Sequence, residues 1–168
     1  MWCDWPWQPA ADYAELEPSL GSWLLSQDSM TRRLRAHSRS FHVQLLAQEP
    51  VSEPLPNWLA LPAPVVQRTV LLHADAKPCI FAQTLGSAEA LRHLGEQPLG
   101  DRLFGQDAWH RGPLLLTQVM PEQLPRGVAT APLWARCSAF HHQDKAPLWV
   151  MEAFLPAIFR LQRSTTTS

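Results

Sequence analysis

The chain has 168 residues, of which 17% are charged, and its formal net charge at pH 7 is −1. This length suits one domain that buries its own core, and the near-neutral charge gives no electrostatic basis for binding nucleic acid. No apolar run approaches the roughly 18 residues of a membrane-spanning helix, and the N-terminus lacks the basic and apolar regions of a signal peptide. Three widely spaced cysteines fit a reducing compartment, so we expect a cytoplasmic domain.

The first part of the chain combines an aromatic arm with two short helices. Residues 1–17 contain three Trp among Asp, Glu and Pro without a hydrophobic period. We interpret them as an N-terminal arm whose Trp side chains pack on the body of the domain, with membrane anchoring as the alternative. A proline followed by apolar residues at helical spacing predicts a helix from residue 18. A second helix is predicted over residues 30–37, with Met30 in its first turn.

The rest of the chain is dominated by predicted strands. Alternating or continuous apolar patterns predict strands over residues 41–46, 65–73, 79–84, 114–120, 133–141 and 148–155. Between them we expect an extended proline-rich loop over 49–64, a hairpin turn over 74–78, short helices over 88–94 and 101–104, and a loop over 121–132 that could cover a pocket.

Hairpin-type connections outnumber crossovers in this pattern, and no internal repeat is found. The predicted fold class is therefore α+β, a single domain over residues 1–168 with an antiparallel sheet and a few short helices. The polar tail, residues 163–168, is expected to fray.

Two charged residues occupy apolar faces of predicted strands. Period-two alternation places Glu152 on an apolar face of the strand 148–155 and Arg68 on an apolar face of the strand 65–73. A buried charge is costly unless it is paired or hydrogen-bonded. Two opposite charges therefore suggest a shared polar cavity, in which a guanidinium can grip a carboxylate. The alternatives are a purely structural Arg68–Glu152 ion pair and a Glu152 that leans out at a sheet edge.

The sequence lacks the common catalytic motifs. It contains no glycine-rich phosphate loop, no G-x-S-x-G elbow, and no H-E-x-x-H or paired-cysteine metal motif. Cys137 and His141 share a strand face, but two ligands do not make a zinc site. Cys79 and Cys137 lie in predicted strands, where a buried and inert thiol is the ordinary case, although a cysteine nucleophile stays open. What remains is a cavity without metal or cofactor that holds an Arg and a Glu.

A set of short motifs, each weak alone, is specific in its order and spacing across nearly the whole chain. The motifs are Ser22-Trp-Leu-Leu, Asp28-Ser-Met-Thr-Arg-Arg, Arg68-Thr-Val-Leu-Leu, Phe81-Ala-Gln-Thr, Leu94-Gly95 with Pro98-Leu-Gly, Leu133-Trp-Ala-Arg136, and Glu152-Ala-Phe-Leu-Pro-Ala. Together they resemble the chorismate pyruvate-lyase family.

The resemblance implies a monomeric, cytoplasmic bacterial enzyme with an enclosed site and no cofactor or metal. The family converts chorismate to 4-hydroxybenzoate and pyruvate, the first committed step of ubiquinone synthesis. Carried over by motif, the ligand-contacting positions are Met30, Arg68, Leu99 and Glu152. Arg68 would pair with the ring carboxylate, Glu152 would lie near the ring hydroxyl, and Met30 and Leu99 would be apolar walls. Whether Glu152 is a base or only orients the substrate stays open, because the proton can move within chorismate itself.

The sequence also departs from the family pattern. Gln83 stands where the family usually has Arg, a second cation near the ligand. Gln83 is thus a further candidate substrate-binding residue, able to hydrogen-bond a carboxylate but without charge. In Ala135-Arg-Cys-Ser the family's second Arg is missing, which predicts a surface or packing change.

Two interpretations compete with a lyase. The architecture also resembles the small-molecule-sensing domain of certain transcription regulators, which bind an effector and catalyse nothing. The lack of a helix-turn-helix or basic region and the Glu152 motif argue against such a domain. The second alternative, suggested by Gln83, is a related protein that binds 4-hydroxybenzoate without making it.

Overall fold

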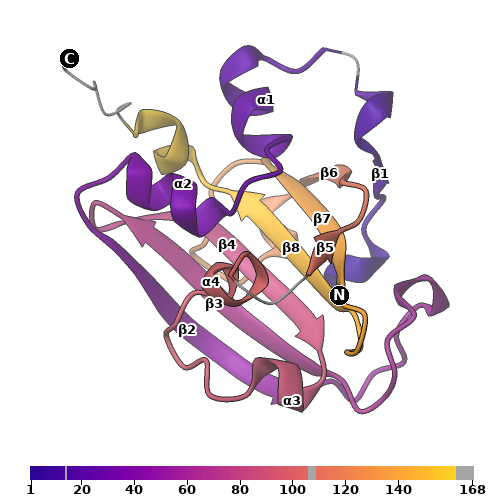
Figure 1. Ribbon diagram of the computed structural model, residues 1–168. Coiled ribbons are helices and arrows are strands. Elements are labelled where there is room, and N and C mark those ends of the chain that lie inside the picture. The colour runs from indigo at the N-terminus through magenta and orange to yellow at the C-terminus, as the bar shows by residue number, and fades with distance from the viewer. Residues whose placement is uncertain (14, 106–108, 162–168) are drawn as a thin grey trace.

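The computed structural model describes residues 1–13, 15–105 and 109–161. Its centre is an antiparallel eight-stranded sheet (Figure 1). The strands are β1 (Gln8–Pro9), β2 (Phe41–Pro50), β3 (Val66–Ala74), β4 (Lys77–Gly86), β5 (His110–Arg111), β6 (Leu115–Val119), β7 (Leu133–His141) and β8 (Leu148–Phe154). The helices are α1 (Pro18–Leu24), α2 (Met30–Ala36), α3 (Ala88–Leu91) and α4 (Leu99–Leu103), with 3-10 helices η1 (Trp2–Asp4), η2 (Ala10–Asp12), η3 (Asn57–Leu59), η4 (Pro121–Gln123) and η5 (Pro156–Arg160). The predicted α+β fold is confirmed.

The strand order explains how distant charged residues meet. It is β1-β6-β7-β8-β4-β3-β2, and β5 pairs with the end of β7 that β6 leaves unpaired. The predicted β3–β4 hairpin turns at Asp75 and Ala76, whose φ angles of 52° and 63° are typical of a two-residue type I′ turn. Because β8 pairs with both β4 and β7, it is a central strand, which is consistent with the apolar residues on both of its faces.

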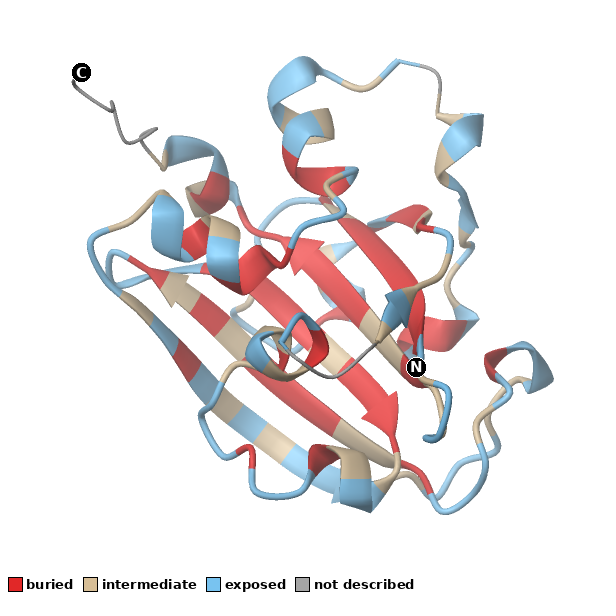
Figure 2. Cartoon of the chain, in the orientation of Figure 1, coloured by how far each residue is buried: buried red, intermediate tan, exposed pale blue. Residues whose placement is uncertain are grey.

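Both faces of the sheet are covered. The helices α1 and α2 and the 3-10 helix η5 pack on one face, whose buried residues include Leu34, Val70 and Phe154. The N-terminal arm and η3 pack on the other face, where Trp2 is 1% exposed against Phe81. Burial is greatest in β4, β7 and β8 and falls toward the edge strand β2 (Figure 2). The predicted packing of the Trp-rich arm on the body is confirmed.

Differences from the predicted elements are local. The strand β2 continues to Pro50, into the segment 49–64 that was predicted to be a loop, because it pairs with β3 as far as Val66. The helix predicted over 88–94 ends at Leu91. His93 then adopts a positive φ of 61°, with which a right-handed helix cannot continue. Strands β1 and β5 were missed because two residues show no period. The tail 163–168 lies outside the described residues.

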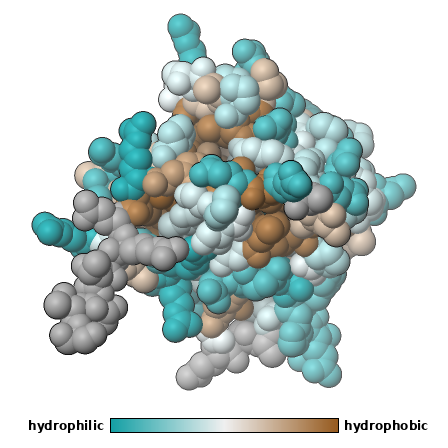
Figure 3. Space-filling model, turned by 90° about the horizontal axis from the view of Figure 1, so that it is seen from above, coloured by the Kyte–Doolittle hydropathy of each residue, from teal (hydrophilic) through white to brown (hydrophobic). Residues whose placement is uncertain are grey.

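The surface of the described residues carries both apolar and hydrophilic side chains. None of the described helices combines the length and the hydropathy that a membrane crossing requires. Seen from above, apolar patches are separated by hydrophilic side chains (Figure 3). Large exposed apolar residues such as Leu25, Trp58 and Met120 lie on different elements. Scattered exposure of this kind is normal for a globular protein.

Candidate active site

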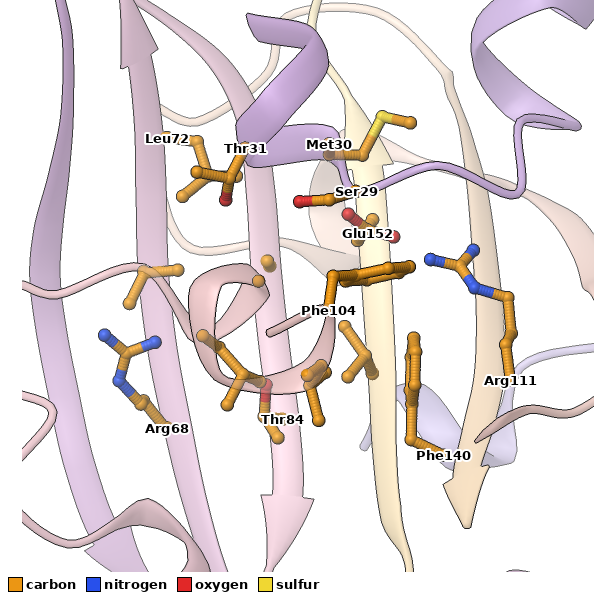
Figure 4. Close-up of a pocket in the computed structure, with 16 residues that line it drawn as sticks. Ser29, Met30, Thr31, Arg68, Leu72, Thr84, Phe104, Arg111, Phe140 and Glu152 are labelled. Carbon is orange, nitrogen blue, oxygen red and sulfur yellow. The ribbon is translucent and has the colours of Figure 1, made fainter. Parts of the chain in front are cut away.

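A cavity lies between the sheet and the helices α2 and α4 (Figure 4). It is lined by Ser29, Met30, Thr31, Arg68, Val70, Leu72, Ala82, Thr84, Leu99, Gly100, Leu103, Phe104, Arg111, Phe140, Val150 and Glu152. One face of the strands β3, β4, β7 and β8 forms its floor, and the first turns of α2 and α4 cover it. Four predicted site residues, Met30, Arg68, Leu99 and Glu152, therefore line one cavity. The loop 121–132, which was expected to cover a pocket, does not line it.

The two helices that cover the cavity are in close contact. The Ser29 hydroxyl caps α2 by accepting a hydrogen bond from the Arg32 N–H at 3.3 Å, and this directs Met30 inward, where it is 4% exposed. At the start of α4, a Cβ on Gly100 would lie 2.7 Å from Ser29 Oγ and 2.8 Å from Thr31 Oγ1. Only glycine allows α4 to approach α2 this closely without a shift.

Gly100→Ala is therefore expected to push α4 away from α2 and to loosen the packing of the two helices that cover the cavity. The cost is about 1–3 kcal/mol of unfolding free energy, typical of overpacking, with weaker ligand binding. Urea unfolding measures the loss of unfolding free energy, and ligand titration measures the weaker binding. Gly21→Ala in α1 is the matched control, because its Cβ would meet only Leu16 Cβ at 3.6 Å, so this change is expected to be neutral or stabilising. Equal behaviour of the two variants would contradict the packing argument.

Glu152 has a buried partner that was not predicted. Its Oε1 accepts a hydrogen bond from Arg136 Nε at 3.0 Å, and the two residues are directly opposite on β8 and β7. Arg136 is 0% exposed, and its Nη1 donates to the backbone carbonyls of Leu24 at 3.2 Å and Ser26 at 2.6 Å. The considered Arg68–Glu152 ion pair is thus replaced by an Arg136–Glu152 pair, and Glu152 is 9% exposed rather than leaning out at an edge.

Arg68 enters the cavity from β3 and is 2% exposed. Its Nη2 donates to the backbone carbonyls of Gly95 at 3.0 Å and Gln97 at 2.9 Å, in the connection between α3 and α4. Its Nε is buried and has no hydrogen-bond partner among the described residues. Burial, followed by the charge of Arg102, lowers the pKa of Arg68 below its ordinary value. Arg68 therefore fixes the connection before α4 and keeps donor capacity for a ligand.

A second arginine in the cavity, Arg111, was missed by the sequence analysis. It lies on β5, opposite Phe140 of β7. Its guanidinium carbon is 4.9 Å from the centre of the Phe140 ring and 5.5 Å from that of Phe104. Burial lowers the pKa of Arg111 to about 10, while the negative charge of Glu152 acts in the opposite direction. No sequence signal identifies Arg111, because its strand is only two residues long.

Comparison with known proteins identifies the family of this chain. The family model described as chorismate lyase matches residues 3–164. This chain belongs to the chorismate lyase family. It is 34% identical over 157 residues to a probable chorismate pyruvate-lyase of Methylobacillus flagellatus, a match that covers 83% of this chain and 88% of the relative. A probable chorismate pyruvate-lyase of Pseudomonas putida is 36% identical over 149 residues, covering 82% and 81% of the two chains.

Other proteins of known structure share this fold. The effector domain of PhnF from Mycobacterium smegmatis matches with a TM-score of 0.60 and 17% identity, over 79% of this chain and 91% of that domain. The C-terminal domain of the histidine utilization repressor from Pseudomonas syringae pv. tomato matches with a TM-score of 0.54 and 9% identity, over 73% and 96%. These likenesses concern the fold alone, so the chorismate lyase family rests on the sequence matches.

Gln83 does not reach the cavity of this chorismate lyase family member. Its neighbours on β4, Ala82 and Thr84, line the cavity, so alternation directs Gln83 to the opposite face of the sheet. There its Nε2 donates to Thr69 Oγ1 at 3.1 Å, and it lines a separate depression with Trp5. The structure therefore does not bring this candidate substrate-binding residue together with the others.

The cysteines also lie away from the cavity of this family member. Cys3, Cys79 and Cys137 are buried free thiols, and burial is the main cause that raises the pKa of each. Cys137 is 0% exposed, so the change from the family's Arg is one of packing rather than of surface. Among the described residues, no three His, Cys, Asp or Glu side chains gather as a metal ion would require.

Proposed function

We propose that this protein removes pyruvate from chorismate to give 4-hydroxybenzoate, as a cytoplasmic monomer that commits chorismate to ubiquinone synthesis. The observation that carries the proposal is a cavity, in a chain of the chorismate lyase family, with a cation and a carboxylate at separate points of one largely apolar floor. Arg68 is opposite Thr84 of β4, and Thr84 is opposite Val150, two residues before Glu152 on β8. The strands β3 and β8 lie about 10 Å apart, with a further offset of about 7 Å along the strands. Long side chains from both positions can bracket one ring.

Each of the four predicted site residues that line the cavity then has a role in binding. Arg68 pairs with the ring carboxylate, because its buried Nε has no partner among the described residues. Glu152, fixed by Arg136, accepts a hydrogen bond from the hydroxyl at the opposite end of the ring. Met30 and Leu99, the first residues of α2 and α4, are apolar walls against the ring. The helices α2 and α4 cover the cavity and limit the access of water to the reacting bonds.

The reaction balances without any added reagent. The ether C–O bond between the ring and the enolpyruvyl group breaks, and its oxygen becomes the keto oxygen of pyruvate. The hydrogen on the neighbouring, hydroxyl-bearing ring carbon leaves as a proton, the ring becomes aromatic, and the methylene carbon of the leaving group gains a proton. This proton moves either directly within the substrate or through Glu152. Because aromatisation supplies much of the driving force, the protein's main contribution is to orient the substrate.

The deciding experiment is to mix purified protein with chorismate, without added metal or nucleotide, and to separate the products by chromatography. We expect equimolar 4-hydroxybenzoate and pyruvate, formed faster than in the uncatalysed decay. No turnover, with 4-hydroxybenzoate still raising the melting temperature, would contradict the proposal and indicate a small-molecule-binding protein instead.

Arg68→Ala is expected to weaken binding of both substrate and product. Loss of a charge-assisted hydrogen bond predicts a rise of about 10- to 100-fold in KM for chorismate and in the inhibition constant of 4-hydroxybenzoate. Steady-state kinetics with and without product measure both constants. Arg126→Ala removes an exposed arginine and is the matched control. If both constants stay unchanged in Arg68→Ala, the ring carboxylate is bound elsewhere.

A further inference from the structure

We propose that Arg111 binds the carboxylate of the enolpyruvyl group, the part of the substrate that leaves as pyruvate. The cavity would then hold separate cationic sites for the two carboxylates of chorismate. This inference rests on the proposed lyase function and deepens it, since it assigns a residue to the leaving group.

The first observation is that Arg111 is a half-buried cation whose guanidinium is only partly hydrogen-bonded. Its Nε and Nη1 are buried and make no hydrogen bond to the described residues. Arg68 and Arg136 differ, because each donates to two backbone carbonyls. Burial of an unpaired guanidinium is costly, and proteins retain such groups mainly where a ligand completes the bonding. Arg111 lines the cavity with its guanidinium beside the Phe104 and Phe140 rings, which contact each other edge to face (Figure 4).

The second observation is the charge balance at the cavity. Arg68, Arg111 and Glu152 line it, and Arg136 is bonded to Glu152, so these four side chains carry a net charge of +2; Asp28, which does not line the cavity, acts more weakly on Arg111 than Glu152 does. A ligand with two carboxylates neutralises this excess, whereas 4-hydroxybenzoate, with one, leaves a positive charge unmatched. The charge distribution therefore favours the dicarboxylate substrate over its aromatic product, and it favours product release after pyruvate has left.

The third observation is the position of Arg111 relative to Glu152. The enolpyruvyl group is attached to the ring carbon next to the one that bears the hydroxyl. If the hydroxyl is held at Glu152 and the ring carboxylate at Arg68, the enolpyruvyl group lies beside Glu152. Arg111 points toward Glu152 in Figure 4, and the two charges attract each other. As the C–O bond breaks, negative charge grows on the leaving oxygen, and a fixed guanidinium nearby stabilises it.

The test compares substrate and product binding in Arg111→Met, which keeps an apolar stem beside the two rings and removes the charge. We expect kcat/KM for chorismate to fall by about 10- to 100-fold, the usual effect of losing a charge-assisted hydrogen bond. The Kd of 4-hydroxybenzoate is expected to change by no more than about threefold, a long-range charge effect. Retained product binding also shows that the cavity is folded. Arg111→Lys keeps a point charge and should recover part of the loss, and Arg126→Met is the matched control.

Two results would overturn the inference. Unchanged kcat/KM in Arg111→Met would show that Arg111 does not bind the substrate. Equal weakening of chorismate and 4-hydroxybenzoate would place Arg111 at the ring carboxylate instead. If the wild-type protein does not turn over chorismate, the same difference is measured as Kd by calorimetry. The failure of the proposed function is thus distinguished from the failure of the Arg111 assignment.

Discussion

Replacing Glu152 with Gln is expected to lower kcat for chorismate by at least about 100-fold, the lower range for loss of a positioned acid–base group. Gln keeps the size of the side chain and an oxygen that can accept the hydrogen bond from Arg136 Nε. It lacks the negative charge and cannot take up a proton. The fold and the binding of 4-hydroxybenzoate should therefore survive, whereas Glu152→Ala would also leave the Arg136 cation unpaired in the core.

Stopped assays with chromatographic detection of 4-hydroxybenzoate measure this effect, and calorimetry with the product checks that the cavity is intact. Glu122→Gln, which changes an exposed carboxylate on η4, is the matched control. Near wild-type turnover by Glu152→Gln would remove Glu152 from the mechanism.

A reaction of the wild-type protein in D₂O separates the two proton routes. Deuterium in the pyruvate methyl group indicates transfer through an exchangeable group such as Glu152, and its absence indicates transfer within the substrate.

Strand alternation was sufficient to predict that Arg68 and Glu152 face the cavity, but not that Glu152 pairs with Arg136. Arg68 and Glu152 interrupt apolar faces in the sequence, and both line the cavity. The partner of Glu152 depends on which strands are neighbours and on their register, and β7 places Arg136 directly opposite Glu152. Neither property is local in sequence. The motif Leu133-Trp-Ala-Arg136 therefore identified the family without revealing that its arginine holds Glu152.

The two differences between the predicted and the observed cavity lining have different physical origins. Gln83 was assigned to the ligand by its place in a family motif, although alternation with Ala82 and Thr84 contains the information that it faces the other side. Arg111 could not be found by any period, because β5 has two residues and is defined only by its pairing with β7. Tertiary contacts, rather than local patterns, place the second arginine in the cavity.

Arg136→Met is expected to lower the unfolding free energy by about 3–5 kcal/mol, because it leaves the Glu152 carboxylate buried without its partner. The same change removes the bonds from Nη1 to the carbonyls of Leu24 and Ser26, so the connection that leads into α2 also loses its attachment. Urea unfolding followed by tryptophan fluorescence measures the loss. Arg126→Met, at an exposed position, is the matched control and should be close to wild type.

The double variant Arg136→Met with Glu152→Leu separates the two contributions. Replacing both members of a buried ion pair by apolar groups is often neutral for stability, so this variant should recover the part of the loss that comes from the unpaired carboxylate. The loss of unfolding free energy that remains measures the hydrogen bonds from Arg136 to the carbonyls of Leu24 and Ser26, at the end of α1 and in the connection before α2. Turnover by the double variant should be absent, because it lacks the Glu152 carboxylate. If Arg136→Met alone unfolds like the wild type, the Arg136–Glu152 pair does not hold the site together; if the double variant recovers nothing, the carbonyl bonds carry the whole effect.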